Sequence, residues 1–296
     1  MPYAGELSAL LTACLWSGSA VVFASATKRM GSFQVNITRL VLAAVYLVLM
    51  TAMLGLDVNL SGRQILNLSI SGVVGLTLGD TFLFKAFQEI GARISMLIMS
   101  TAPAIAATLA YVFLGEDLSF AGVLGIMVTV AGVSVVVLDR GGPGSKGVPL
   151  TISGLLFAAL GAAGQGGGLI FAKLAFREGE INGFVATAVR IIASLVLLLP
   201  VALMTKRYSS PVRMFIQDRK AFWQTALGSV LGPFLGISFS LIAIEYTKVG
   251  IAATIMALVP ILMLPLVRFV YKEKLTWRAI FGAFVAVGGV ALLFLR

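Results

Sequence analysis

One carboxylate lies in the middle of a long apolar stretch of the sequence. Asp80 sits near the centre of the apolar run 68–88, too far from either end for its side chain to reach water along a helix. A buried ionisable group in such a run is costly and marks a functional site by default. Asp80 could therefore exchange a proton or bind a substrate ammonium group. The alternative is a structural ion pair or hydrogen bond with a neighbouring helix.

A lysine follows Asp80 in the same run. Lys85 is five residues further on, about 140° around a helix, so the two side chains do not share a face. Glu89 lies four residues after Lys85 and on its face, which favours a local ion pair near the end of the run. The other interpretation is that Lys85 receives a substrate carboxylate.

The remaining candidates are uncharged. Gln165 stands within the glycine-rich stretch 161–168, which favours either close helix packing or an unwound segment against a ligand. Four large side chains could form the walls of a cavity of mixed polarity, although ordinary packing explains each equally well: Trp16, Phe84, Met99 and Met256. Pro103 and Pro260 fall midway through two apolar runs. There proline would kink a helix, as a gate hinge or a fixed bend.

Several kinds of chemistry lack the residues that they require. The sequence has no histidine, a single cysteine (Cys14) and no Walker A motif. Intramembrane aspartyl proteolysis needs two carboxylates at one site, and only Asp80 is deep in a run. We therefore expect no enzymatic activity and no metal site.

The composition indicates which elements must position these residues. Of 296 residues, 59% are hydrophobic and 11% charged, and the mean hydropathy is +1.03, which predicts a polytopic membrane protein in contact with lipid. The Lys and Arg residues behind the net charge of +10 fall mostly in short loops and form no stripe for nucleic acid. Ten apolar runs of about 20 residues or more each could cross a bilayer: 7–26, 34–54, 68–88, 94–114, 119–138, 150–175, 182–204, 222–246, 249–271 and 276–295.

The chain repeats itself internally. At an offset of 157 residues, runs three to five align with runs eight to ten, and Pro103 then meets Pro260. Asp80, in contrast, meets Ile237. The repeats are 1–140 and 150–296, joined by a linker at 141–149. Because five helices are an odd number, the two copies must be inverted in the membrane, which is typical of alternating-access transporters. The predicted fold is an all-α integral membrane protein with ten transmembrane helices in two inverted five-helix repeats.

Two arginines also recur, one in each repeat. Arg39 and Arg190 occupy similar positions near the start of the second and seventh runs. Recurrence in both halves favours a structural task, either capping a helix or tying it to its neighbour.

Short motifs in both repeats resemble those of a known family. Ala-Pro-Ala at 102–104 and Leu-Gly-Glu-Asp-Leu-Ser at 114–119 have counterparts in Val-Pro at 259–260 and Lys-Glu-Lys-Leu-Thr-Trp at 272–277. With Trp16-Ser-Gly in the first run, these resemble the EamA-like branch of the drug/metabolite transporter superfamily. The resemblance implies a ten-helix carrier of small metabolites, often an exporter of amino acids or related compounds, without a cofactor. It also implies a central cavity lined mainly by helices one, three, four, six, eight and nine.

The sequence therefore predicts a secondary-active carrier, working by alternating access in the cell inner (plasma) membrane as a monomer or homodimer. Its substrate would be a small polar or amphiphilic metabolite. A passive channel or a non-transporting scaffold or sensor is the alternative. The orientation stays open, because two indications oppose each other. Of 22 Lys and Arg residues, 12 lie in the loops opposite the termini, which by the positive-inside rule places the termini outside. The family resemblance implies cytoplasmic termini.

Overall fold

The computed structural model describes residues 3–115, 119–138, 150–205, 208–247, 252, 255–270 and 275–294. Every regular element in these ranges is a helix. Seven helical segments are long and apolar enough to cross a membrane, and three shorter helices are also apolar. An all-helical, multi-pass membrane architecture is thus confirmed, while the count of ten crossings stays a prediction.

The first repeat begins with two long helices, α1 (Ala4–Met30) and α2 (Ser32–Leu54). Next come α3 (Gly62–Gly72), η1 (Val73–Gly79) and α4 (Asp80–Met99), which follow one another directly; within α4, the non-helical backbone of Gly91, with a φ of 75°, separates two helical pieces. A capping box between Ser61 and Gln64 starts α3, satisfying backbone N–H groups that the first turn leaves free. The repeat ends with α5 (Ala102–Leu114) and α6 (Phe120–Leu138).

The second repeat follows the same order. It comprises α7 (Ile152–Arg177), α8 (Gly183–Met204), the short α9 (Pro211–Gln217), then α10 (Arg219–Ser229), η2 (Val230–Gly236) and α11 (Ile237–Tyr246), and finally α13 (Val259–Val270) and α14 (Trp277–Phe294). Polar residues cap several of these helices: Thr151, Asn182, Ser210 and Asp218 each accept a hydrogen bond from a backbone N–H in the first turn. The linker predicted at 141–149 lies outside the described residues.

Two π-helical segments mark the repeat in the backbone itself. η1 covers residues 73–79 and η2 covers residues 230–236, which is the same offset of 157 residues seen in the sequence. Such segments are rare and are frequent at functional sites. The residue that follows η1 is Asp80, and the residue that follows η2 is Ile237.

The two recurring prolines do not kink continuous helices. The predicted runs 94–114 and 249–271 are each interrupted by a turn, at 100–101 and 257–258. Pro103 is the second residue of α5, and Pro260 is the second residue of α13. Proline is well tolerated in a first turn, where its missing N–H leaves no hydrogen bond unmade. Each proline therefore begins a half-helix, which corrects the mid-helix kink expected from the sequence.

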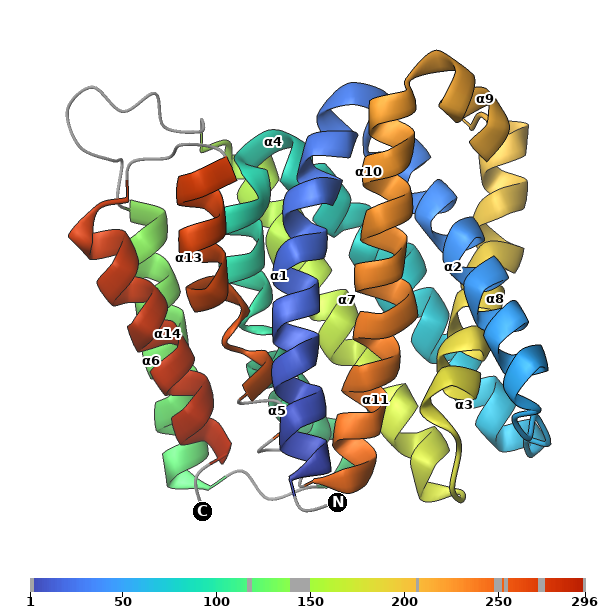
Figure 1. Cartoon of the computed structure of the whole chain (residues 1–296). Coiled ribbons are helices and arrows are strands. Elements are labelled where there is room, and N and C mark those ends of the chain that lie inside the picture. Colours follow the sequence, from blue (N-terminus) through green and yellow to red (C-terminus); the bar gives the residue numbers. More distant parts are fainter. Residues whose placement is uncertain are drawn as a thin grey trace.

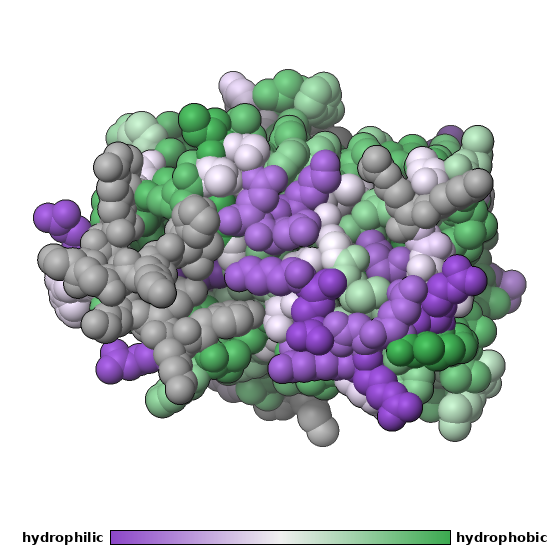
Figure 2. Space-filling model, turned by 90° about the horizontal axis from the view of Figure 1, so that it is seen from above, coloured by the Kyte–Doolittle hydropathy of each residue, from purple (hydrophilic) through white to green (hydrophobic). Residues whose placement is uncertain are grey.

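The helices stand roughly side by side, and α1 begins at the same end of the molecule at which α14 ends (Figure 1). Seen from the opposite end, hydrophilic residues gather between apolar flanks (Figure 2). The helix ends here carry basic side chains: Lys28 and Arg29 in the last turn of α1, Arg213 in α9 and Lys220 at the start of α10. This arrangement is that of a membrane protein with apolar sides and one strongly polar, basic end.

Helix α7 packs closely against the segment α3–η1–α4 through paired glycines. A Cβ atom on Gly164 would lie 2.5 Å from the Cα atom of Gly79, and one on Gly168 would lie 3.1 Å from that of Gly75. Since α7 is continuous from Ile152 to Arg177, its glycines serve close packing, and the unwound segment that the sequence also allowed does not occur. Small residues of this kind are the usual route to tight helix contacts in lipid.

Candidate functional site

A cavity of about 180 Å³ lies at the centre of the molecule between the two repeats. Helices α1, α2, α4, α5, α7, α8, α11 and α13 all contribute to its wall, together with η2. Most of the lining is apolar, and the charged lining residues are Arg39, Asp80 and Arg190. A mostly apolar cavity with a few convergent polar groups is the usual form of a small-molecule site.

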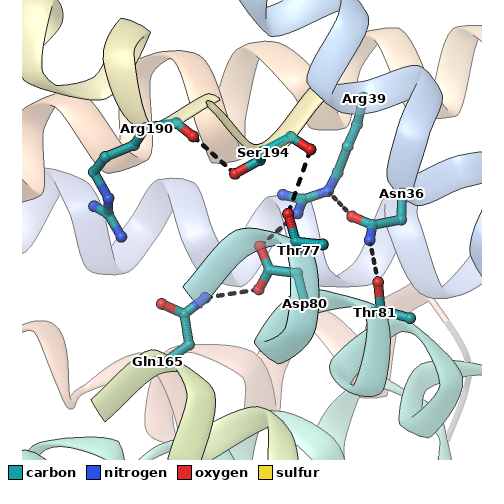
Figure 3. Close-up of polar contacts among 8 residues, drawn as sticks. All are labelled: Asn36, Arg39, Thr77, Asp80, Thr81, Gln165, Arg190 and Ser194. Carbon is teal, nitrogen blue, oxygen red and sulfur yellow. Dashed lines mark hydrogen bonds and ion pairs between the residues drawn. The ribbon is translucent and has the colours of Figure 1, made fainter. Parts of the chain in front are cut away.

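Asp80 is held by partners from two other helices (Figure 3). Its residue is only 4% exposed. One carboxylate oxygen, Oδ2, accepts a hydrogen bond from Nη2 of Arg39 on α2, and the two groups form an ion pair. The other, Oδ1, accepts a hydrogen bond of 2.7 Å from Nε2 of Gln165 on α7. Asp80 thus joins both repeats through its two oxygens.

Arg39 is as fully engaged as Asp80. Its Nε donates to Oδ1 of Asn36 over 2.9 Å, and Asn36 in turn donates from Nδ2 to Oγ1 of Thr81 over 3.0 Å. The guanidinium also lies over the ring of Phe84, 4.6 Å from its centroid. An ion pair, a hydrogen bond and a cation–π contact therefore fix this side chain. The tie between neighbouring helices expected for Arg39 is present, and it also forms part of the cavity wall.

Arg190 contrasts with its counterpart. It is 3% exposed and lines the same cavity, yet its Nε is buried without a hydrogen-bond partner. No ion pair within 4 Å joins its guanidinium to any described carboxylate, and the dashed line at Arg190 in Figure 3 runs from the hydroxyl of Ser194 to the backbone carbonyl of Arg190, not to its guanidinium. The tie expected from its recurrence is therefore not seen for this guanidinium among the described residues.

Glycines make room for these polar groups. A Cβ atom on Gly75 would lie 3.4 Å from Nη2 of Arg190 and 3.6 Å from Oε1 of Gln165. In the other repeat, a Cβ atom on Gly236 would lie 2.6 Å from Nε1 of Trp16. A larger residue at either position would therefore crowd the cavity wall directly.

The structure brings together eight of the nine residues selected from the sequence. These line the cavity: Trp16, Asp80, Phe84, Met99, Pro103, Gln165, Met256 and Pro260. They come from both repeats, and Met99 and Met256 occupy equivalent positions. Their shared position around one cavity makes them candidates for contact with a ligand.

Lys85 is the exception and corrects the expectation of a substrate contact. It is exposed and does not line the cavity, and its Nζ lies 4.9 Å from the ring centroid of Phe157. Within the described part of the chain, no ion pair joins it to Glu89. Glu89 instead accepts a hydrogen bond of 2.8 Å from Thr151. The helix geometry already separated Lys85 from the face of Asp80, so its place outside the cavity follows from that spacing.

Sequence reasoning did not select Arg39 and Arg190 as site residues. Their recurrence in both repeats was the available signal, and it is compatible with a shared place at a pseudo-symmetric centre as well as with a structural tie. Burial distinguishes the two cases, because a buried guanidinium group that lines a cavity needs a charge partner there.

The arrangement can bind and orient a small molecule. A few charged groups among many apolar side chains suit a ligand with both polar and apolar parts. Among the described residues, no group of three or more His, Cys, Asp or Glu could hold a metal ion.

Comparison with known proteins places this geometry in context. The sequence model of the EamA-like transporter family matches residues 3–138 and again 152–295. Protein LicB from Haemophilus influenzae is 36% identical over 72 residues, which is 24% of this chain and 25% of LicB. The chain thus matches about a quarter of the length of that relative. A chain of known crystal structure shares the fold, with a TM-score of 0.70 at 18% identity, over 99% of this chain and 96% of its own.

The two family matches correspond to the two helical repeats and together span nearly the whole sequence. Apolar helices, an internal duplication and a buried central cavity agree with that assignment. The chain belongs to the EamA-like transporter family and is a multi-pass membrane protein.

Proposed function

We propose that this protein exports a small polar or amphiphilic metabolite, such as an amino acid or a related compound, by secondary-active transport. The cavity between the repeats would be the binding site, and the two inverted repeats would rock around it to expose it to either side in turn. We further propose that it works in the inner (plasma) membrane of the cell. The observation that carries the proposal is the cavity itself, which both repeats line and in which three buried charged residues meet.

The paired half-helices support a moving part. α5 and α13 each begin directly after a turn and have a proline as their second residue. These two helix starts are at equivalent positions beside the cavity. Such interruptions let a short helix shift without breaking a continuous hydrogen-bond ladder. Pro103 and Pro260 would therefore act at hinges because a helix starts there.

An efflux assay tests the proposal. Proteoliposomes are loaded with an equimolar mixture of amino acids, organic acids, amines, nucleosides and sugars, and the compounds that leave are identified by mass spectrometry. We expect one chemical class to leave faster than from protein-free liposomes. Ala257→Phe, which places a ring at the cavity wall, should slow that efflux. Val48→Phe, at a side chain that is 54% exposed on α2, should not.

The same assay separates the alternatives. A passive channel would release many classes together, inorganic ions included, because it has no selective binding step. A scaffold or sensor would release none above the protein-free control. Either result would refute the carrier.

A further inference from the structure

The two repeats carry different chemistry at equivalent positions beside the cavity. In the first repeat, Arg39 meets the carboxylate of Asp80. In the second repeat, the residue equivalent to Asp80 is Ile237, which also lines the cavity. Arg190 is thus an arginine whose repeat lacks the carboxylate that would pair with it.

The charges of the cavity do not cancel among the described lining residues. Arg39 and Arg190 contribute two positive charges and Asp80 contributes one negative charge, which leaves one positive charge in excess. Asp80 influences Arg190 electrostatically, but its two oxygens already accept from Arg39 and Gln165. Arg190 is therefore a buried guanidinium with an unsatisfied Nε and no carboxylate of its own.

Burying such a group without a partner is unfavourable, whereas an anionic ligand would supply the missing partner. We propose that Arg190 binds the carboxylate of the transported molecule, so that the substrate class is small organic carboxylates with an apolar part. This inference rests on the transport function proposed above and names the substrate class of the same cavity.

Three features favour a carboxylate over other groups. The planar fork of arginine matches the two oxygens of a carboxylate, and one unpaired guanidinium matches a single negative charge. A phosphate monoester carries about 1.5 to 2 negative charges at neutral pH, more than one guanidinium neutralises. A substrate ammonium would meet a cavity with excess positive charge, in which the oxygens of Asp80 are already occupied.

The rest of the wall suits the apolar part of such a molecule. Trp16, Phe84, Met99 and Met256 surround the same space. Aromatic rings and the flexible thioethers of methionine adapt to apolar groups of different shape. The acid group would therefore determine the orientation of the ligand, and these side chains would accept its tail.

The test compares three compounds that share one apolar part: 3-phenylpropionate, 3-phenylpropionamide and 3-phenylpropylamine. They are loaded together into proteoliposomes alongside the mixed metabolites of the efflux assay. For the wild type we expect carboxylates to leave selectively. Arg190→Gln should weaken the binding of those carboxylates about 10- to 100-fold, the range expected for lost hydrogen bonds to a charged group. Arg190→Lys should recover part of the loss, and Arg213→Gln on the exposed side of α9 should change nothing.

Melting of the ligand-free protein separates binding from a structural role. Because the Nε of Arg190 has no partner to lose, Arg190→Gln should melt no lower than the wild type. A large fall in melting temperature would overturn the proposal and make Arg190 a structural tie. Selective efflux of amines or neutral compounds would also overturn it while leaving the transport function intact. Efflux of nothing at all would refute the transport function and, with it, this inference.

Discussion

Removing Arg39 alone should leave the carboxylate of Asp80 buried without its cation. The two side chains are 5% and 6% exposed, so water cannot replace the missing partner. Breaking a buried ion pair in this way costs about 3–5 kcal/mol. We therefore expect Arg39→Met and Asp80→Leu each to lower the free energy of unfolding by that amount.

The double variant distinguishes pairing from mere crowding. With both charges gone, an apolar pair of similar volume occupies the space, and replacements of this kind are close to neutral. What remains is the loss of partners for Asn36 and Gln165, about 1–3 kcal/mol each. The double variant should thus cost about 2–6 kcal/mol, below the sum of about 6–10 kcal/mol for the two singles.

Equilibrium unfolding in mixed micelles, followed by tryptophan fluorescence, would give the three free energies. Additive single effects, within about 0.5 kcal/mol, would refute the reasoning, because they would mean that the two side chains do not interact. The same measurements reveal any change in cooperativity, since the slope against denaturant should stay constant.

A second ion pair offers the matched control. Arg29 and Asp218 lie 2.7 Å apart, but Arg29 is 43% exposed, and we expect no measurable coupling between them. The hydrogen bond from Arg29 holds the pKa of Asp218 below its ordinary value. Because the folded-state pKa is depressed, any stabilisation is complete above the ordinary pKa of aspartate. It is lost as the pH falls through the lowered value. Unfolding measured from pH 7 to pH 3 would check this direction.

Two further predictions concern packing and orientation. Gly164→Ala places a Cβ atom 2.5 Å from the Cα atom of Gly79, so the helices must separate and the fold should lose about 1–3 kcal/mol. Gly288→Ala, with nothing within 4 Å of its new Cβ atom, should be neutral or stabilising, and equal melting of the two variants would contradict the packing argument. From the charge bias alone, the positive-inside rule predicts that the basic end faces the cytoplasm. The test introduces single cysteines into a variant that lacks the native cysteine and treats intact cells with an impermeant maleimide. Arg213→Cys should then resist labelling, and Asn59→Cys should be labelled. The reverse pattern would show cytoplasmic termini.

Much of this architecture could be predicted from the sequence because membrane helices and repeats leave strong local signals. The equivalence of Pro103 and Pro260 predicted two equivalent elements beside the cavity, and these were found. The form of the interruption could not be predicted, because a proline in an apolar run is compatible with a kink and with a new helix start. Asp80 was identifiable by its depth within one run, which requires no knowledge of neighbouring helices.

The partners of Asp80 depend on contacts between distant helices, which no single run encodes. Arg39 lies 41 residues from Asp80 and Gln165 lies 85 residues away, so only the packed bundle brings them together. Lys85 shows the converse case. It is only five residues from Asp80, but the helix period turns the two side chains to different faces, and of the two only Asp80 lines the cavity.

The two π-helical segments record the order of events in the history of this chain. A π-helical turn accommodates an additional residue in an otherwise α-helical segment, and both halves carry theirs at equivalent positions, 157 residues apart. A feature of this kind in both copies is most simply inherited from a single ancestral half, before the gene duplicated and fused. The difference between Asp80 and Ile237 must then have arisen after duplication, when the halves were free to diverge. The molecule thus combines an old backbone irregularity, shared by both halves, with a younger difference in charge between them. Specificity for an asymmetric ligand could evolve only after duplication, when the two halves diverged.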